Sequence, residues 1–524
     1  MTEQSQYNHM LMFALGPVQP FIMQARKTRD LWIGSLVLSK LMEAAMSGIK
    51  GQFVFPAIQT VKDIPDIPNK YVALFSSLEQ AQQAAQQSKE QIKERWVAMC
   101  QTVWEKVIAI YSDQATQIIW QRQTNFDHLF EIYWAIVERQ EGKNYSAWLD
   151  ETESLFAARK RLRDFRPQNE PGEKSAISGE REVLRGIRTD REGLRLFWQK
   201  IARKHSSSDI NQQGDERLDA IDMIKRFAIQ VHAIAGKGAF PSTSSIATGS
   251  FVEKLLDSDP QREAWRQWRE VTAGKLASKS QDAAQDIPYL AQKASKEWQW
   301  ILQRDGDLYF PAVFAPHRPE KDYDLPDSTS TIKRGKAALA ALLDEADTLN
   351  ITRPTPYYAI MQMDGDNMGL LLGSTRAAAD HEAISAALSD FARGIAPDLV
   401  ERQYPARLVY AGGDDVLAFA PLARDVTSTN RDQPLSILAL ADELQARYQD
   451  RVKKALSLVP PPQDGEQGQT VTASMGIAIA HHYTSLSYVL RSAREEEHAA
   501  KERYGRNALV VSILRRSGEQ TQVG

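Results

Sequence analysis

Two short motifs in the last third of the chain carry most of its acidic chemistry. Asp364-Gly365-Asp366 directly follows an apolar run, and Gly412-Gly413-Asp414-Asp415 stands between two further apolar runs. Carboxylates held close together repel one another, and their pKa values rise unless cations neutralise the charge. Two Mg²⁺ ions about 3.5–4 Å apart supply that neutralisation and hold both oxygens of an in-line phosphoryl transfer. We therefore expect Asp364, Asp366, Asp414 and Asp415 to bind Mg²⁺ or Mn²⁺ in a site that joins nucleotides.

The glycines of these motifs are consistent with such a site. Gly412 and Gly413 can take positive φ in a tight hairpin turn. They also let a nucleotide approach the backbone, and Gly365 does the same after the first apolar run. The alternative is an ordinary hairpin with solvated loop aspartates. Either motif alone favours that alternative, whereas both together, each after an apolar strand, favour a metal site.

The elements expected around the motifs have the order of a palm domain. The order β-α-β-β-α-β, followed by one more helix and strand, matches a ferredoxin-like palm. In this topology the first strand lies beside the hairpin at the centre of the sheet, so the two acidic motifs meet at one edge. The expected strands are 357–363, 407–410, 416–420, 471–480 and 508–514, and the expected helices are 381–400, 435–456 and 486–504.

The beginning of the chain predicts a weaker copy of this layout. No acidic residue follows its first strand, so we expect the copy to be non-catalytic. The segment 111–345 reads as mostly helical. The expected strands of the copy are 9–15, 53–55 and 71–75, and its helices are 21–47 and 78–111. We predict an α+β protein with two ferredoxin-like palm domains joined by largely helical domains, divided at 1–110, 111–250, 251–345 and 346–518.

Composition limits the remaining possibilities. The chain has 524 residues, 43% of them hydrophobic and 25% charged, as in ordinary folded proteins. No apolar run is long enough to span a membrane, and we expect a cytoplasmic protein. The net charge of −3 is close to neutral, so nucleic acid would be bound through local patches or partner proteins. Cys100 is the single cysteine, which excludes a disulfide within the chain and a zinc site built on several cysteines.

Three further groups could contact phosphate. Ser242 and Thr243 lie in a hydroxyl-rich turn, 238–245, whose amides and hydroxyls could hold phosphate or ribose; a helix N-cap explains the turn equally well. Arg26, Lys27 and Arg29 could face RNA, a second nucleotide or water, and composition favours a solvated face. The helix 486–504 carries a cationic face, for which a solvated surface balanced by glutamates is the alternative.

Many separate motifs, in order from about residue 10 to about residue 518, resemble the Cmr-type large subunit of type III-B CRISPR effector complexes. They include Leu15-Gly16-Pro17-Val18-Gln19, Pro68-Asn69-Lys70-Tyr71, Phe240-Pro241-Ser242-Thr243, both acidic motifs and Ala473-Ser474-Met475-Gly476. The resemblance implies a nucleotidyltransferase that makes cyclic oligoadenylate from ATP. It implies other Cmr-type subunits and CRISPR RNA as partners, and target RNA as the activating ligand.

The resemblance also assigns roles to individual residues. It implies that Asp364 and Asp414 are the main metal ligands, with help from Asp366 and Asp415. It implies that Ser242 and Thr243 face a nucleotide. The fold also resembles the GGDEF diguanylate cyclases, in which a lysine before Gly-Arg-Asn contacts phosphate; Lys501 holds that place before Gly505-Arg506-Asn507.

The chain departs from the family pattern in three places. The palm-like region begins at once, so the HD nuclease domain that often opens the family is not expected. Lys174-Ser175-Ala176-Ile177-Ser178-Gly179 stands where relatives often carry a Lys-Cys-x-x-Cys-Gly motif, so zinc is not expected there. The small helical domain that usually ends the family is not expected after Arg516-Ser517-Gly518, whether it is naturally absent, lies on another chain or was removed by truncation. Two alternatives stay open: a non-catalytic ATP-binding subunit of the same complex and a free-standing diguanylate-type cyclase.

Overall fold

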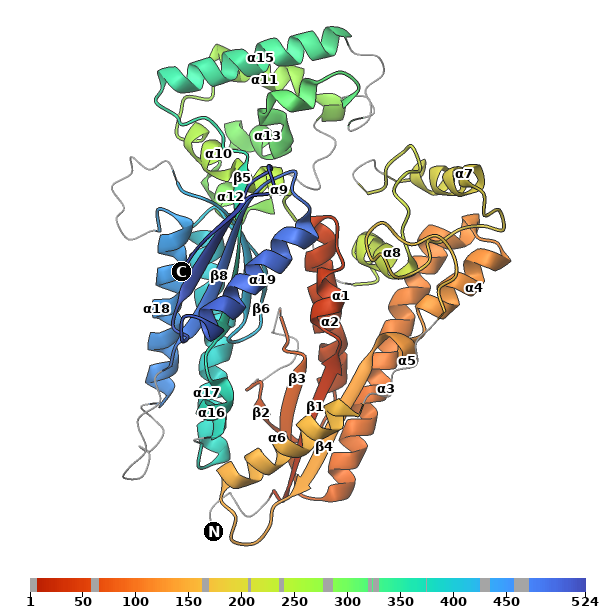
Figure 1. The fold of residues 1–524 in the computed structure, drawn as a ribbon, viewed down its shortest axis with the longest axis vertical. Coiled ribbons are helices and arrows are strands. Elements are labelled where there is room, and N and C mark those ends of the chain that lie inside the picture. The colour runs from red at the N-terminus through yellow and green to blue at the C-terminus, as the bar shows by residue number, and fades with distance from the viewer. Residues whose placement is uncertain are drawn as a thin grey trace.

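Two β-sheets, with helices around and between them, organise the computed structural model of the protein (Figure 1). Every helix in the described part of the chain is too short or too polar to cross a lipid bilayer. The structure describes residues 7–57, 66–162, 169–205, 209–234, 240–276, 286–318, 323, 329–373, 375–424, 434–456 and 471–524.

The first sheet belongs to the N-terminal palm. Its strands are all antiparallel and have the order β2-β3-β1-β4, which is the ferredoxin-like order. Side chains alternate along β1, so that Leu11 and Phe13 pack toward helices α2 and α3, and Met10 and Met12 pack toward helix α6. The elements are β1 (His9–Gly16), α1 (Gln19–Met23), α2 (Thr28–Met46), β2 (Gln52–Phe55), β3 (Lys70–Phe75), α3 (Leu78–Val103), β4 (Glu131–Glu138) and α6 (Tyr145–Arg161).

Two expectations for this region need correction. The helix expected at 21–47 is divided into α1 and α2, because the chain leaves helical geometry at Gln24. The expected boundary at residue 110 falls inside the domain, because β4 lies beyond it and pairs with β1 along its whole length. The sequence of β4 alternates buried Tyr133, Ala135 and Val137 with less buried neighbours, as a sheet strand does.

The second sheet belongs to the C-terminal palm. Its order is β10-β9-β8-β5-β7-β6, and the part β8-β5-β7-β6 repeats the ferredoxin-like order of the first sheet. Helices α17 and α18 cover one face and α19 covers the other. The elements are β5 (Tyr357–Gly365), α16 (Met368–Gly373), α17 (Ala378–Asp390), β6 (Arg407–Ala411), β7 (Val416–Pro421), α18 (Ile437–Leu456), β8 (Ala473–His481), α19 (Leu486–Glu502), β9 (Leu509–Leu514) and β10 (Gln520–Val523).

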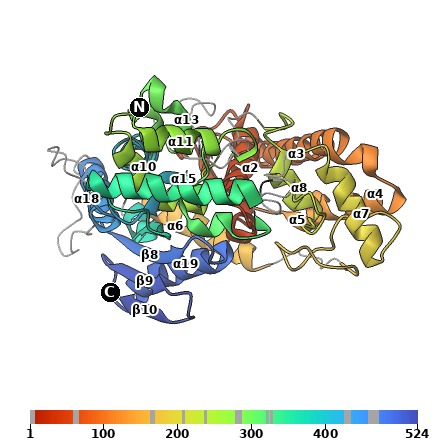
Figure 2. The same ribbon diagram turned by 90° about the horizontal axis from the view of Figure 1, so that it is seen from above.

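The rest of the described chain is mostly helical, with longer loops at residues 169–190 and 209–219. Figure 2, viewed from above, shows α15 crossing over the N- and C-terminal parts, with α7 and α4 at the far end of the molecule. The helices are α4 (Gln114–Gln123), α5 (Phe126–Leu129), α7 (Arg191–Ala202), α8 (Ala220–Phe227), α9 (Thr243–Ala247), α10 (Gly249–Leu255), α11 (Glu263–Val271), α12 (Pro288–Lys293), α13 (Gln299–Leu302) and α15 (Thr329–Thr348).

The two palms face each other through α17. Its His381 accepts or donates a 2.9 Å hydrogen bond with the Tyr145 hydroxyl of α6. The Ser385 hydroxyl of the same helix accepts from the backbone N–H of Ala57, at 2.6 Å. The N-terminal palm therefore forms one wall of any pocket at the acidic edge of the C-terminal sheet.

Candidate active site

The two acidic motifs meet at one edge of the C-terminal sheet. Strand β5 pairs with β7 up to Met363 and Val416, so Asp364 emerges beside the hairpin. The backbone N–H of Gly365 donates to the carbonyl of Asp414 at 3.2 Å. Gly413 adopts a φ of +109°, a conformation that favours glycine and that the hairpin turn requires.

Gly365 serves packing rather than nucleotide approach. A Cβ at this position would lie 2.4 Å from the Tyr448 hydroxyl and 2.8 Å from the Cβ of Asp414. At Gly412, by contrast, a Cβ would meet no atom within 4 Å. Free space of the kind expected for a nucleotide therefore lies beside Gly412. Gly365 is needed for a different reason, because a side chain there would prevent β5 from approaching the hairpin.

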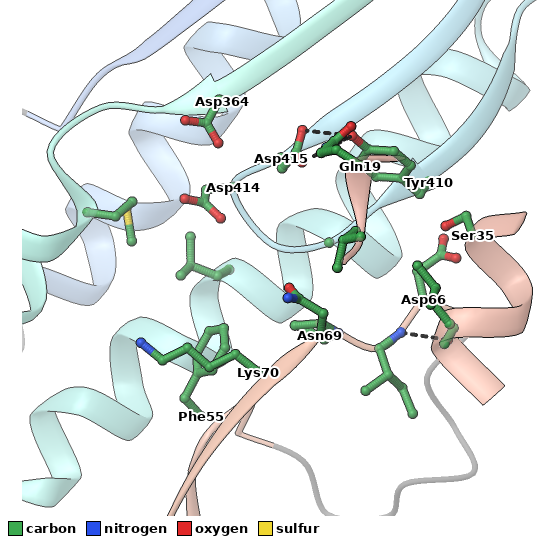
Figure 3. A pocket seen from close by; sticks show the side chains of 18 of the residues that line it. Gln19, Ser35, Phe55, Asp66, Asn69, Lys70, Asp364, Tyr410, Asp414 and Asp415 are labelled. Carbon is green, nitrogen blue, oxygen red and sulfur yellow. Dashed lines mark hydrogen bonds between the residues drawn. The ribbon is translucent and has the colours of Figure 1, made fainter. Parts of the chain in front are cut away.

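A pocket of about 380 Å³ opens at this edge, between the two palms (Figure 3). Its C-terminal wall carries three of the predicted carboxylates, and its N-terminal wall carries polar side chains that the sequence did not single out for the site. The residues that give the pocket its polar character are Gln19, Ser35, Ser39, Asp66, Asn69, Lys70, Glu153, Asp364, His381, Tyr410, Asp414 and Asp415.

Ionisation of the two hairpin carboxyl groups, Asp414 and Asp415, is unfavourable in the folded protein. Burial and the neighbouring Asp364 raise the pKa of Asp414 from 3.8 to about 7. Burial, Asp364 and Asp414 raise the pKa of Asp415 well above its usual value, although the Tyr410 hydroxyl donates to it at 3.1 Å. An added cation would relieve this repulsion, and oxygen ligands of this kind suit Mg²⁺.

Lys501 already pairs with one of these acids. Its ammonium group contacts the carboxylate of Asp364 and lies 2.7 Å from Glu497, one turn earlier in α19. These acids in turn raise the pKa of Lys501 above its usual value, against the opposing effect of partial burial. The phosphate contact predicted for Lys501 remains a prediction, but the structure places the lysine at the edge of the acidic cluster.

Asp366 does not join the pocket. Its carboxylate is buried and accepts from Thr472 Oγ1 at 2.8 Å, Ser474 Oγ at 2.7 Å and the backbone N–H of Asn507 at 3.0 Å. Both oxygens are thereby used within the protein. The predicted metal ligation by Asp366 therefore has no support in this geometry, and the residue instead ties the end of β5 to β8 and to the turn after α19.

The described residues contain no group of three or more histidine, cysteine, aspartate or glutamate side chains already arranged around a cation position. Two features account for this. Asp366 is engaged elsewhere, and Asp364 points to Lys501. A metal site here would therefore need Asp364 to exchange its ammonium partner for the metal and substrate phosphates to supply further oxygens.

Ser242 and Thr243 lie elsewhere. Ser242 caps α9, its hydroxyl accepting from the Ser245 N–H at 3.0 Å, and the Thr243 hydroxyl donates to the carbonyl of His482 at 3.0 Å. Both line a separate pocket of about 560 Å³ with Arg26, Lys27 and the loop after β8. The structure places these two residues apart from the carboxylates, and the nucleotide contact that the resemblance implies for them remains a prediction. Gly238 and Ala239 lie outside the described residues.

The degenerate zinc-motif region is held by hydrogen bonds. Ser175 donates to Asp222 at 2.6 Å, and Ser178 donates to Asp219 at 2.8 Å. Arg181 pairs with the same Asp219 at 2.9 Å. These serines occupy the places at which the resemblance puts cysteines, and their contacts link this loop to the beginning of α8.

The N-terminal wall of the pocket is what sequence reasoning missed. Gln19 Nε2 donates to the Tyr410 hydroxyl at 3.4 Å, and Asp66 accepts from the backbone N–H of Ala411 at 3.4 Å. Gln19 and Pro68-Asn69-Lys70 both lie in motifs that carry the family resemblance. That resemblance was the available signal, since nothing in the local pattern points to a site.

Comparisons with known proteins agree with this architecture. Residues 10–101 match the family model "CRISPR-associated protein Cmr2, N-terminal", and residues 357–510 match "Cas10/Cmr2, second palm domain". The CRISPR system Cmr subunit Cmr2 of Pyrococcus furiosus is 23% identical over 97% of this chain, and the chain spans 62% of that relative's length.

Two solved structures share the fold. A type III-B Cmr-beta complex in the apo state matches 99% of this chain and 71% of its own chain, with a TM-score of 0.63 and 14% identity. The same kind of complex bound to cognate target RNA matches 99% and 70%, with a TM-score of 0.56 and 14% identity. The Cmr2 N-terminal model and the Cas10/Cmr2 second palm model thus match this chain in order, and the Cmr-beta structures share its fold.

Proposed function

We propose that this chain joins ATP molecules into cyclic oligoadenylate in the pocket between its two palms. The observation that carries the proposal is the acidic edge itself. Asp364, Asp414 and Asp415 line one pocket, and burial and mutual repulsion raise the pKa values of the last two. Burying and crowding ionised carboxylates is unfavourable, and it is expected where a site binds cations together with phosphates.

The reaction proposed is nucleotidyl transfer. The ribose 3′-hydroxyl of one nucleotide attacks the α-phosphate of another, a new P–O3′ bond forms, the bond between the α-phosphorus and its bridging oxygen breaks, and pyrophosphate leaves. The hydroxyl proton passes to solvent or to a neighbouring base. Repetition and closure on the first nucleotide give a ring. The open space beside Gly412 leaves room for nucleotides next to the acids.

The residues fit Mg²⁺ or Mn²⁺ by donor type. Asp364 and Asp414 would hold the metal ions, with Asp415 beside them, and Asp366 is left out because its oxygens are already used. Bound metal would neutralise the carboxylates and stabilise charge on the transferring phosphate. Lys501, released from Asp364, would be free to contact a phosphate, as the resemblance implies.

The partners are also part of the proposal. We infer that the chain assembles with other Cmr-type subunits and CRISPR RNA and that target RNA activates it. A Cmr-beta structure of the same fold was solved with cognate target RNA, which supports RNA as a ligand of such assemblies.

The test uses the full chain purified with the subunits and RNA that co-elute with it. Labelled ATP or GTP and Mg²⁺ are added with and without target RNA, and products are separated by chromatography. We expect ring product from ATP, dependent on target RNA, and its complete loss when Asp414 and Asp415 are both replaced by alanine. Asp442→Ala, on the exposed face of α18, is the matched control and should retain synthesis.

Three results would contradict the proposal. ATP binding without product in the assembled complex would indicate a non-catalytic ATP-binding subunit. Product from GTP by the chain alone would indicate a diguanylate-type cyclase. Undiminished synthesis by the double alanine variant would place the chemistry elsewhere.

A further inference from the structure

The pocket between the palms has two chemically different ends. In Figure 3, Asp364, Asp414 and Asp415 lie on one side of the view, and Ser35 and Asp66 lie on the other. All five line the same pocket. The first end is acidic and suits phosphate with metal; the second joins two polar side chains to apolar walls, the combination that a nucleobase fits.

The apolar walls of the second end come from the N-terminal palm. Ile22, Leu38 and Ile67 line the pocket there, and all three are at least nine-tenths buried. These apolar side chains can pack against the face of a base, and they form no hydrogen bonds with its edge. The polar groups of this end are therefore the ones left to read that edge.

Ser35 and Asp66 have unused hydrogen-bonding capacity. Ser39, one turn after Ser35 on α2, accepts from the Ile67 N–H at 2.8 Å and so holds the segment that begins with Asp66 against this face of the helix. Asp66 accepts one hydrogen bond, from the Ala411 N–H at 3.4 Å. Within the described part of the chain, the Ser35 hydroxyl and the other Asp66 oxygen have no hydrogen-bond partner.

We propose that Asp66, assisted by Ser35, reads the Watson–Crick edge of one of the two nucleobases and thereby selects adenine over guanine. This inference rests on the proposed function and names a specificity-determining residue of the same site. Asp66 is well placed for it, because its contact at Ala411 stands directly before the Gly412-Gly413-Asp414-Asp415 turn. Base and phosphate would then be held by neighbouring points of one hairpin.

The chemistry of a carboxyl group explains the choice of base. Adenine presents an N6 amino donor beside the N1 acceptor, which a protonated carboxyl matches with one acceptor and one O–H donor. Guanine presents the N1–H and N2 amino donors side by side, which an ionised carboxylate matches with two acceptors. A neutral Asp66 therefore favours adenine, and an ionised Asp66 favours guanine.

The surroundings of Asp66 keep its carboxyl protonated up to about pH 7, well above the range in which an ordinary aspartate is neutral. Burial raises its pKa from 3.8 to about 7, against the opposing effect of the Ala411 N–H. Glu401 raises the pKa further, and Arg407 and Lys40 lower it. The other titratable groups that line the same pocket are Lys70, Glu153, Asp364, His381, Tyr410, Asp414 and Asp415.

The experiment measures base selectivity directly. The full chain, purified with its co-eluting partners, is titrated calorimetrically with α,β-methylene ATP and α,β-methylene GTP in Mg²⁺ at pH 6 and pH 8.5. For a carboxyl that must be protonated and titrates near 7, affinity for the ATP analogue should fall about thirty-fold between these pH values relative to the change that Asp66→Asn shows, while that for the GTP analogue rises.

Variants separate Asp66 from other titrating groups. The asparagine of Asp66→Asn keeps one donor and one acceptor at every pH. The affinity of this variant for the ATP analogue should therefore depend on pH no more than the metal site requires. Its affinity for the GTP analogue should not rise with pH as that of the wild type does. Ser35→Ala should weaken both analogues without removing the pH dependence. Asp442→Asn should behave as the wild type does.

The outcomes distinguish this inference from the function on which it rests. If the wild type binds the ATP analogue but its ATP-to-GTP ratio is unchanged by pH or by Asp66→Asn, the assignment of Asp66 is wrong and the proposed function stands. If the wild type binds neither analogue, the proposed function fails and this inference fails with it.

Discussion

Replacing Asp414 by asparagine should make the metal-free protein more stable while removing its response to Mg²⁺. The carboxylate is ionised in the unfolded chain above its ordinary pKa of 3.8, whereas burial and Asp364 raise its pKa in the folded protein to about 7. A folded group with a raised acidic pKa loses stability as pH rises from about 4 to about 7, and the loss is constant above that range. Asparagine carries no charge, so the variant does not lose folding stability as the pH rises through this range.

The magnitude follows from the two pKa values. A difference of about three pH units corresponds to about 4 kcal/mol, since each unit is worth about 1.4 kcal/mol. The side chain is partly open to the pocket, so screening by water reduces the expected gain to about 2–4 kcal/mol above pH 7. At pH 4.5 the same reasoning gives about 1 kcal/mol or less.

The assay is urea unfolding of wild type, Asp414→Asn and the control Asp442→Asn, with EDTA or with Mg²⁺. In EDTA at pH 8 the Asp414 variant should unfold at higher urea than the wild type, and the control should not. Mg²⁺ should stabilise the wild type, because it binds the folded state, and should have little effect on the Asp414 variant. Two results would refute the explanation that Asp414 is a desolvated carboxylate repelled by its neighbours. The first is an Asp414→Asn variant no more stable than the wild type at pH 8. The second is a gain in unfolding free energy that is the same at pH 4.5 and pH 8.

Three other changes test neighbouring parts of the site. Asp366→Asn should destabilise the fold by about 2–4 kcal/mol, because it removes the charge that strengthens the hydrogen bonds from Thr472, Ser474 and Asn507; unchanged urea unfolding would contradict the structural role. Lys501→Met should lower ring synthesis while strengthening Mg²⁺ binding measured calorimetrically, since Asp364 loses its competing cation, and weaker Mg²⁺ binding would count against the ion pair. Gly365→Ala should cost about 1–3 kcal/mol through overlap with the hairpin, whereas Gly369→Ala, where a Cβ meets open space, should cost nothing measurable.

The sequence was most informative where local pattern and tertiary structure agree. In β5 the apolar run carries Tyr358 and Ile360 to one core and Met361 and Met363 to the other, so a strand buried on both faces could be recognised from composition alone. The same holds for the hairpin strands, and with them the β-α-β-β-α-β order. The meeting of the two acidic motifs then followed from topology, without knowledge of any side-chain contact.

The orientation of each acid could not be predicted in this way. Asp364 and Asp366 are two residues apart and belong to one motif, yet Asp366 is turned to Thr472, Ser474 and Asn507, which lie more than 100 positions later in the chain. Those partners are brought in by the pairing of β8 with β5 and by the turn after α19. The sequence shows which residues can bind a cation, and only the assembled sheet shows which of them are already satisfied.

The N-terminal palm shows why missing acids do not imply a missing role. It lacks a carboxylate at the end of β1, which predicts that it does no metal chemistry of its own. Its Gln19 nevertheless donates to Tyr410, whose hydroxyl donates to Asp415, and its Asp66 binds the backbone just before the hairpin turn. These contacts exist because α17 docks the two sheets together, with Ala57 bonded to Ser385. Each palm alone therefore has half a pocket, and a change that loosens this docking should impair nucleotide selection even when every carboxylate is intact.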